Sequence, residues 1–186
     1  MSGRRQQILD AALAIADRDG VDKVSMRAVA EDVGVTPMAL YRHFDNKVAL
    51  LDGMVERLVT SLRPEQVTGR WDERLTALAH GYRSLAQRHP WSADLLFSRP
   101  SVTPDAARVT EFIYAAIREA GVPESQVGRL ERLVTTFVIG FAASEALGRF
   151  ADRPVDFTAE FDADLADLKQ LIKAAAGLQD RTGQVR

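Results

Sequence analysis

Apolar residues recur at spacings of three and four along almost the whole chain, and this periodicity constrains the fold more than any other feature. The first example is the stripe Ile8, Ala11, Ala12, Ile15 and Ala16. Such spacing places side chains on one face of an α-helix, whereas a half-buried strand needs strict alternation, which no segment shows. The sequence therefore predicts an all-α protein.

Two short helices joined by a tight turn are expected within residues 25–44. Ser25 is a good N-cap for the first helix and Gly34 breaks it, while Thr36 and Pro37 restart the chain as N-cap and first helical residue. This pattern predicts a helix-turn-helix, in which the second helix presents its N-terminal residues to the major groove of DNA. Leu40 and Phe44 should turn back into the core, which leaves an outer face of Pro37, Met38, Ala39 and Arg42, flanked by Tyr41 and His43.

Further helices are expected at about 47–62, 71–88, 92–98, 104–120, 124–150 and 157–176, with prolines between them or at their starts. We therefore predict three segments: a three-helix helix-turn-helix domain over residues 1–47, an all-helical effector-binding and dimerisation domain over 48–177, and a disordered tail over 178–186.

Charge is distributed unevenly around the predicted helix-turn-helix. The net charge of −2 alone argues against DNA binding, because phosphate contacts need lysine and arginine. The acidic residues of this region, however, fall largely on the first helix and its exit, at Asp10, Asp17, Asp19 and Asp22. The basic groups cluster around the outer face instead, at Arg27, Arg42, His43 and Lys47. The free amides at the helix starts, Ser25, Thr36 and Asn46-Lys47, would also favour phosphate.

Several classes of function are disfavoured by composition. The chain has no cysteine, its three histidines lack companions at metal-ligand spacing, and it has no glycine-rich phosphate loop or Ser/His/Asp set. We expect no metal, no cofactor and no enzymatic activity. The sequence also lacks a long apolar run, so we expect a soluble cytoplasmic protein with no membrane contact.

The run GVTPMALYRHFDNKVALL, with the sequence before it from Arg4, resembles the TetR family of bacterial regulators. The pairs Leu40-Tyr41, His43-Phe44 and Asn46-Lys47 stand in the expected register. The resemblance implies phosphate contacts from Thr36, Tyr41, His43 and Lys47. It also implies base contacts from Arg27, Pro37, Met38, Ala39 and Arg42. Partial core packing of Tyr41, and helix capping by His43, are the alternatives.

Aromatic side chains on the middle helices suggest a ligand pocket, although aromatics at helical spacing are more often plain core. The candidate ligand-binding residues are Tyr82, Trp91, Phe97, Phe112, Phe137, Phe141 and Glu145. Glu145 needs a partner on its apolar stripe. It would either recognise a ligand or pair internally with an arginine such as Arg83 or Arg118, and we favour the internal pair.

The helix expected at 124–150 is apolar on two opposite sides, which predicts burial on both. One side would face its own core and the other a partner subunit, with 157–172 completing a four-helix interface. The candidate interface residues are Leu133, Ile139, Gly140, Ala143, Leu147 and Phe150. The alternative is a central helix of a monomer.

Together these features predict a homodimeric regulator that binds double-stranded operator DNA and is released by a largely apolar or aromatic small molecule. The helix after Lys47 would be the lever between the two halves. The other hypotheses are a small helical enzyme, which no catalytic constellation supports, and a DNA-binding or adaptor protein without a ligand, whose aromatics only fill the core.

Overall fold

The computed structural model describes residues 3–98, 104–149, 151–152 and 154–182. Over these residues the chain forms α-helices and two short 3-10 turns, with no strand. The helices are α1 (Gly3–Asp19), α2 (Met26–Val33), α3 (Pro37–Tyr41), α4 (Lys47–Thr60), α5 (Trp71–Arg88), α6 (Ser92–Ser98), α7 (Pro104–Glu119), α8 (Glu124–Ala146) and α9 (Phe157–Thr182). The all-α prediction is confirmed.

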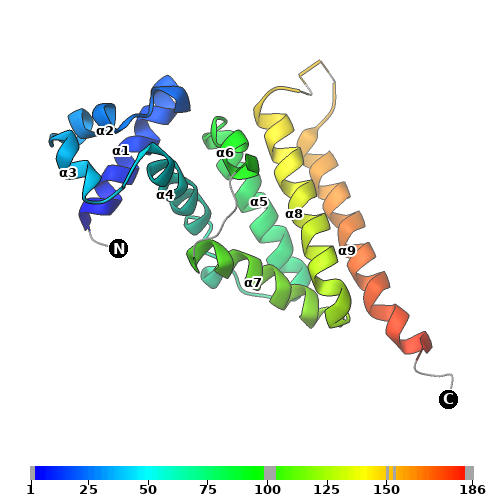
Figure 1. The fold of residues 1–186 in the computed structure, drawn as a ribbon. Helices are drawn as coiled ribbons and strands as arrows, with labels where there is room; N and C mark the ends of the chain where they lie inside the picture. The colour runs from blue at the N-terminus through cyan, green and yellow to red at the C-terminus, as the bar shows by residue number, and fades with distance from the viewer. Residues whose placement is uncertain (1–2, 99–103, 150, 153, 183–186) are drawn as a thin grey trace.

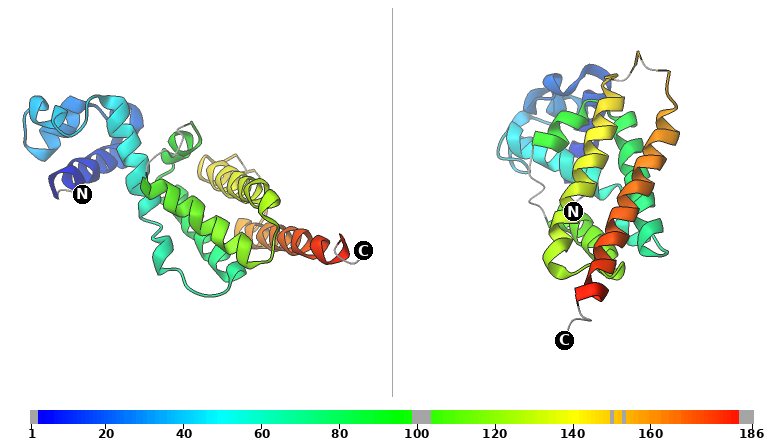
Figure 2. Two further views of the ribbon diagram at one scale, coloured as in Figure 1. Left: turned by 60° about the horizontal axis from the view of Figure 1, so that its bottom comes forward. Right: turned by 90° about the vertical axis from the view of Figure 1, so that its right-hand side faces the viewer.

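The helices divide into an N-terminal unit, α1–α4, and a C-terminal bundle, α5–α9 (Figure 1). Helix α4 leads from the unit toward the bundle, while α8 and α9 lie side by side at the other end of the molecule. The left view of Figure 2 shows the same separation, and in both views the C-terminal end of α9 lies far from the N-terminal unit. This arrangement leaves α2 and α3 at one extremity.

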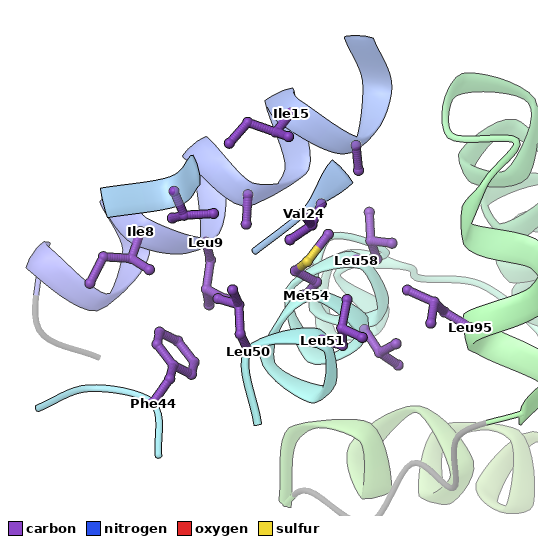
Figure 3. Close-up of a cluster of buried hydrophobic side chains, with 14 of the residues drawn as sticks. Ile8, Leu9, Ile15, Val24, Phe44, Leu50, Leu51, Met54, Leu58 and Leu95 are labelled. Carbon is purple, nitrogen blue, oxygen red and sulfur yellow. The ribbon is translucent and has the colours of Figure 1, made fainter. Parts of the chain in front are cut away.

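The N-terminal core is the cluster of buried apolar side chains that α1, α2 and α4 share (Figure 3). It includes Ile8, Leu9, Val24, Leu50 and Met54, each at most 1% exposed. It also takes in side chains from α5 and α6: Leu85, Leu95 and Leu96. In Figure 3, Leu95 extends from α6 toward α4. The start of the bundle is therefore packed into the core of the N-terminal unit.

Helices α1 and α4 approach each other closely at Gly53. A Cβ atom there would lie 2.9 Å from Cε1 of Phe44 and 3.0 Å from Cδ2 of Leu9, both closer than ordinary van der Waals contact. Glycine costs helix stability relative to alanine. At this position the loss is offset because the bare backbone lets the buried rings and methyl groups of the N-terminal core come together.

The C-terminal core joins α5, α7, α8 and α9. Its most buried members include Ala116, Ile117, Val127, Phe161 and Ile172, each at most 1% exposed. These residues recur at helical spacing on their helices, so each helix buries one stripe against its neighbours. The bundle thus has a core of its own, next to the N-terminal core.

The helices and the N-terminal core of the structure extend differently from the boundaries expected at four places. The N-terminal core continues through Leu50 and Met54, so a domain boundary after residue 47 would cut it. Helix α3 ends at Tyr41, which places the buried Phe44 beyond it. Helix α8 ends at Ala146, where Gly148 adopts a left-handed conformation with φ of 71° and closes the helix end. Helix α9 meets no proline and continues to Thr182, so residues 178–182 are helical, and 183–186 lie outside the described residues.

Candidate nucleic-acid interface and ligand cavity

The turn between α2 and α3 is built from the predicted cap residues. The Ser25 side chain accepts a hydrogen bond from the backbone N–H of Ala28 at 3.1 Å, which fixes the start of α2. Gly34 ends α2 with φ of 71°, a conformation that favours glycine. Thr36 then caps α3, where Pro37 occupies the first turn. The two helices are therefore held in the predicted helix-turn-helix order.

Helix α3 buries one side and exposes the other. Leu40 and Phe44 are 0% and 2% exposed, as expected for residues that anchor the helix to the N-terminal core. Met38 is 71% exposed and Tyr41 47% exposed. We call the exposed set Pro37, Met38, Tyr41, Arg42 and His43 the outer face of α3.

The exposure of Tyr41 and the hydrogen bonds of His43 bear on their alternative roles, core packing and helix capping. Half of the Tyr41 side chain remains in solvent, so packing against the core accounts for only part of it. The His43 ring makes no hydrogen bond within the described residues, so it does not cap its helix there. Lys47 is also exposed, in the first turn of α4.

Some predicted contact residues already have local partners. The hydroxyls of Ser25 and Thr36 serve as helix caps. Arg27 donates from Nε to Oε1 of Glu31 at 2.9 Å, one turn along α2. Such an exposed ion pair contributes little to stability, so Arg27 can leave Glu31 for an anion that attracts it more strongly. Ala39 is half-buried, so only part of its methyl group is accessible.

A partly open cavity of about 60 Å³ lies between α5, α7 and α8 of the C-terminal bundle. Its lining residues are Leu75, Leu78, Ala79, Tyr82, Val109, Ile113, Val134, Thr135, Val138 and Ile139. Only Tyr82 was among the predicted ligand-binding residues. The prediction did not include the other lining residues, because it was based on aromatic side chains. The signal that could have found them is helical register, since 75, 78, 79 and 82 share one face of α5.

The remaining predicted aromatics lie elsewhere. Phe137 and Phe141 pack with Phe161 of α9, with ring centroids 5.0–5.8 Å apart. The Arg74 guanidinium lies over the Phe112 ring, 5.3 Å from its centroid. These three predicted residues therefore belong to the packing of the bundle and do not line the cavity. The side chain of Phe97 lies outside the described residues.

Glu145 is paired internally, as favoured from the sequence. Its carboxylate accepts from Nε and Nη2 of Arg83 at 2.7 and 2.6 Å. The side chains of Arg83 and Glu145 are only 8% and 15% exposed. The hydrogen bond from Arg83 holds the pKa of Glu145 below its usual value, in spite of burial, which acts in the opposite direction. Glu145 does not line the cavity.

Trp91 joins the two halves of the molecule instead of lining the cavity. Its indole Nε1 donates to Oδ1 of Asp17 at 2.6 Å, and Nδ1 of His89 lies 2.7 Å from the same oxygen. Asp17 lies near the end of α1, whereas His89 and Trp91 connect α5 to α6. We name these three residues the α1–α5 clasp.

The residues of the predicted dimer face differ in their exposure. Leu133 on α8 and Leu147 directly after it are 39% and 53% exposed, and a Cβ atom on Gly140 would meet nothing within 4 Å. Leu171 of α9, which the sequence did not single out, is 52% exposed. Ile139, however, lines the cavity. Ala143 is half-buried, and Phe150 lies outside the described residues.

Family comparisons match both parts of the chain. Residues 8–54 match the family model described as "Bacterial regulatory proteins, tetR family", and residues 63–171 match "Tetracyclin repressor-like, C-terminal domain". The HTH-type transcriptional repressor DrrR1 of Streptomyces coeruleorubidus is 34% identical over 83% of this chain. The chain spans 58% of the length of DrrR1 and 63% of an HTH-type transcriptional regulator from Saccharopolyspora erythraea.

Two solved structures are similar to this chain over nearly their whole length. Apo ActR from Streptomyces coelicolor superposes with a TM-score of 0.83 at 24% identity, covering 94% of this chain and 97% of ActR. The structure of BioQ with its double-stranded DNA operator superposes with a TM-score of 0.72 at 27% identity, covering 91% of this chain and 98% of BioQ. Another similar structure is that of BioQ from Mycobacterium smegmatis. The likeness to ActR concerns the fold alone.

Proposed function

The chain belongs to the TetR family of bacterial regulatory proteins, and from this membership we propose that it is a transcriptional repressor that leaves its operator when a small molecule binds. The observation that carries the proposal is the outer face of α3. It combines a capped helix start, a 71% exposed methionine and basic side chains at the extremity of the N-terminal unit. The name of the relative DrrR1 supports repression as the direction of control.

In the proposed complex α3 enters the major groove. Thr36, Tyr41, His43 and Lys47 would contact phosphates, with the capped N-terminus of α4 beside them. The candidates for base contacts are Arg27, Pro37, Met38, Ala39 and Arg42. Arginine can bond guanine bidentately, and the Met38 and Ala39 side chains can pack against thymine methyl groups. BioQ, at 27% identity, has been solved with its operator, which supports this mode of binding.

We propose that the active form is a homodimer. A helix of five residues such as α3 reads few bases, so two copies about 34–36 Å apart, one helical turn of DNA, are needed for specific binding. The exposed surface of α8 and α9 at Leu133, Gly140, Leu147 and Leu171 would form the two-fold contact. Gly140 allows the backbones of two α8 helices to approach closely.

The effector would bind in the cavity between α5, α7 and α8, and such a molecule is largely apolar because the wall is. Binding need only favour a conformation in which the two α3 helices no longer fit the spacing of their half-sites. The proposed action on DNA places the protein in the cytoplasm.

Selection from a pool of random DNA duplexes with the purified protein tests the proposal. The expected result is an enriched sequence with two-fold symmetry and half-sites one helical turn apart. Arg42→Ala should change the preferred bases inside each half-site while the spacing stays constant. If repeated rounds of selection enrich no common sequence, the proposed function is wrong.

A further inference from the structure

Two residues of the cavity wall contact both cores of the molecule. Tyr82 of α5 and Val109 of α7 pack against the C-terminal core and also against the N-terminal core. The other described lining residues are not packed against the N-terminal core. The wall of the cavity is therefore continuous with the interior of the unit that carries α3.

The neighbouring elements explain this double contact. One turn beyond Tyr82 on α5, Leu85 is buried in the N-terminal core at 1% exposure. Helix α7, which carries Val109, packs against α4 as well as against α5 and α8. Both residues thus stand where the bundle meets the N-terminal unit.

The chemistry of the wall limits what the cavity can take. The described lining side chains carry no charge, and the nearby ions Arg83 and Glu145 neutralise each other. The hydroxyl of Thr135 is engaged with Oε1 of Glu131 at 3.0 Å. Burial raises the pKa of the Tyr82 hydroxyl, for which the described residues offer no hydrogen-bond partner. A charged ligand would lose its hydration with nothing in return, because the wall offers almost no polar surface.

The size of the cavity explains how an occupant could act at a distance. About 60 Å³ is well below the ~150 Å³ that holds benzene in a protein core. A ring that is seated fully between the wall side chains must therefore push them outward. Because protein interiors are close-packed, that displacement passes to whatever the wall contacts.

We propose that the cavity takes an uncharged, apolar ligand, and that Tyr82 and Val109 transmit its presence directly to the N-terminal core. This inference rests on the proposed function, since it concerns the ligand class and the regulation of the same site. The proposed transmission runs through α5 and α7, in addition to the coupling of the two halves that is expected for α4.

Three aromatic compounds of similar size and different charge test the ligand class: acetophenone, benzoate and benzylamine. In calorimetric titrations acetophenone should bind, and the two ions should bind at least about tenfold more weakly. Tighter binding of either ion, or no binding of acetophenone, overturns the proposed class.

The chain's two tryptophans report on the transmission. Trp71 belongs to the C-terminal core and Trp91 packs against the N-terminal core, so 5-fluorotryptophan labelling gives each core its own ¹⁹F resonance. Acetophenone should shift both resonances. Val109→Ala should retain the Trp71 shift and lose most of the Trp91 shift. Val134→Ala, the same truncation in a wall residue of the C-terminal core alone, should retain both.

A Trp91 shift that survives in Val109→Ala, or is lost equally in Val134→Ala, overturns the route. The Trp71 resonance shows in every sample whether the variant is folded. Failure of the proposed function is distinguishable, because it appears as absence of sequence-specific DNA binding whatever the resonances do. A protein that binds its selected duplex but responds to acetophenone at neither tryptophan contradicts this inference alone.

Discussion

The guanidinium of Arg83 joins three helices of the C-terminal bundle. It donates to both carboxylate oxygens of Glu145 on α8 and, from Nη2, to Oγ1 of Thr158 on α9 at 3.2 Å. Its carbon Cζ also lies 5.3 Å from the centre of the Phe161 ring. A buried ion with this many partners is satisfied. The pair therefore acts as a structural link of the bundle, next to the cavity but outside its wall.

Glu145→Gln should destabilise the protein by about 3 kcal/mol, because it leaves the Arg83 charge buried without a counter-ion. Urea unfolding at pH 7 measures this loss. Glu124→Gln is the control, since its partner Arg118 lies in an exposed pair whose loss should hardly move the transition. A Glu145→Gln protein as stable as the wild type would show that the pair does not hold the bundle together.

The same pair predicts a pH dependence. Arg83 lowers the pKa of Glu145 in the folded protein, so the stabilisation is present above the usual glutamate pKa of 4.5. It is lost as the pH falls through the lowered folded pKa. The difference in unfolding free energy between wild type and Glu145→Gln should therefore shrink in acid. A difference that is constant from pH 7 to pH 3 would contradict the assigned role.

The outer face of α3 should separate affinity from specificity. Tyr41→Ala removes a phosphate contact and should weaken binding to all DNA sequences alike, whereas Arg42→Ala should change the preferred base. Fluorescence anisotropy with the selected duplex and with single-base variants measures both effects. Lys173→Ala, an exposed lysine on α9, is the control and should change neither. Equal losses for every duplex with Arg42→Ala would remove Arg42 from base reading.

At the scale of elements, the sequence predicts what local chemistry decides. Ser25 and Thr36 were assigned as caps correctly because a cap depends on a few neighbouring residues. The cavity wall depends on which faces of α5, α7 and α8 meet, and single-helix periodicity contains no such information. The positions of aromatic residues in the sequence did not indicate the cavity wall, because Phe137 and Phe141 pack against Phe161.

The α1–α5 clasp is an element-scale contact that no local pattern revealed, since Asp17 and Trp91 are far apart in sequence. Asp17→Ala should cost about 1–2 kcal/mol, because two donors lose one acceptor. It should also shift the Trp91 ¹⁹F resonance. Asp19→Ala is the control, because its exposed partner is the adjacent Arg18. An unmoved Trp91 resonance in Asp17→Ala would show that the clasp does not persist in solution.

At the scale of the whole molecule, the proposed dimer places the two α3 helices at a fixed spacing. Leu147→Glu introduces a charge on the exposed apolar surface of α8 and should shift the protein from dimer to monomer. Sedimentation velocity measures the change. Ala115→Glu, an equally exposed change on α7, should remain a dimer. A wild-type protein that sediments as a monomer at all concentrations would contradict the dimer proposal.

The central claim is that α3 and the start of α4 bind operator DNA through phosphates and bases. The most direct measurement is the dissociation constant for the selected duplex over a range of salt concentrations, for wild type and Lys47→Ala. We expect a Kd of about 10⁻⁸ M or tighter near physiological salt. We also expect a steep loss of affinity with salt, with a slope reduced by about 1 in Lys47→Ala. Equal affinity for the selected and a scrambled duplex at every salt concentration, unchanged by Lys47→Ala, would contradict the central claim.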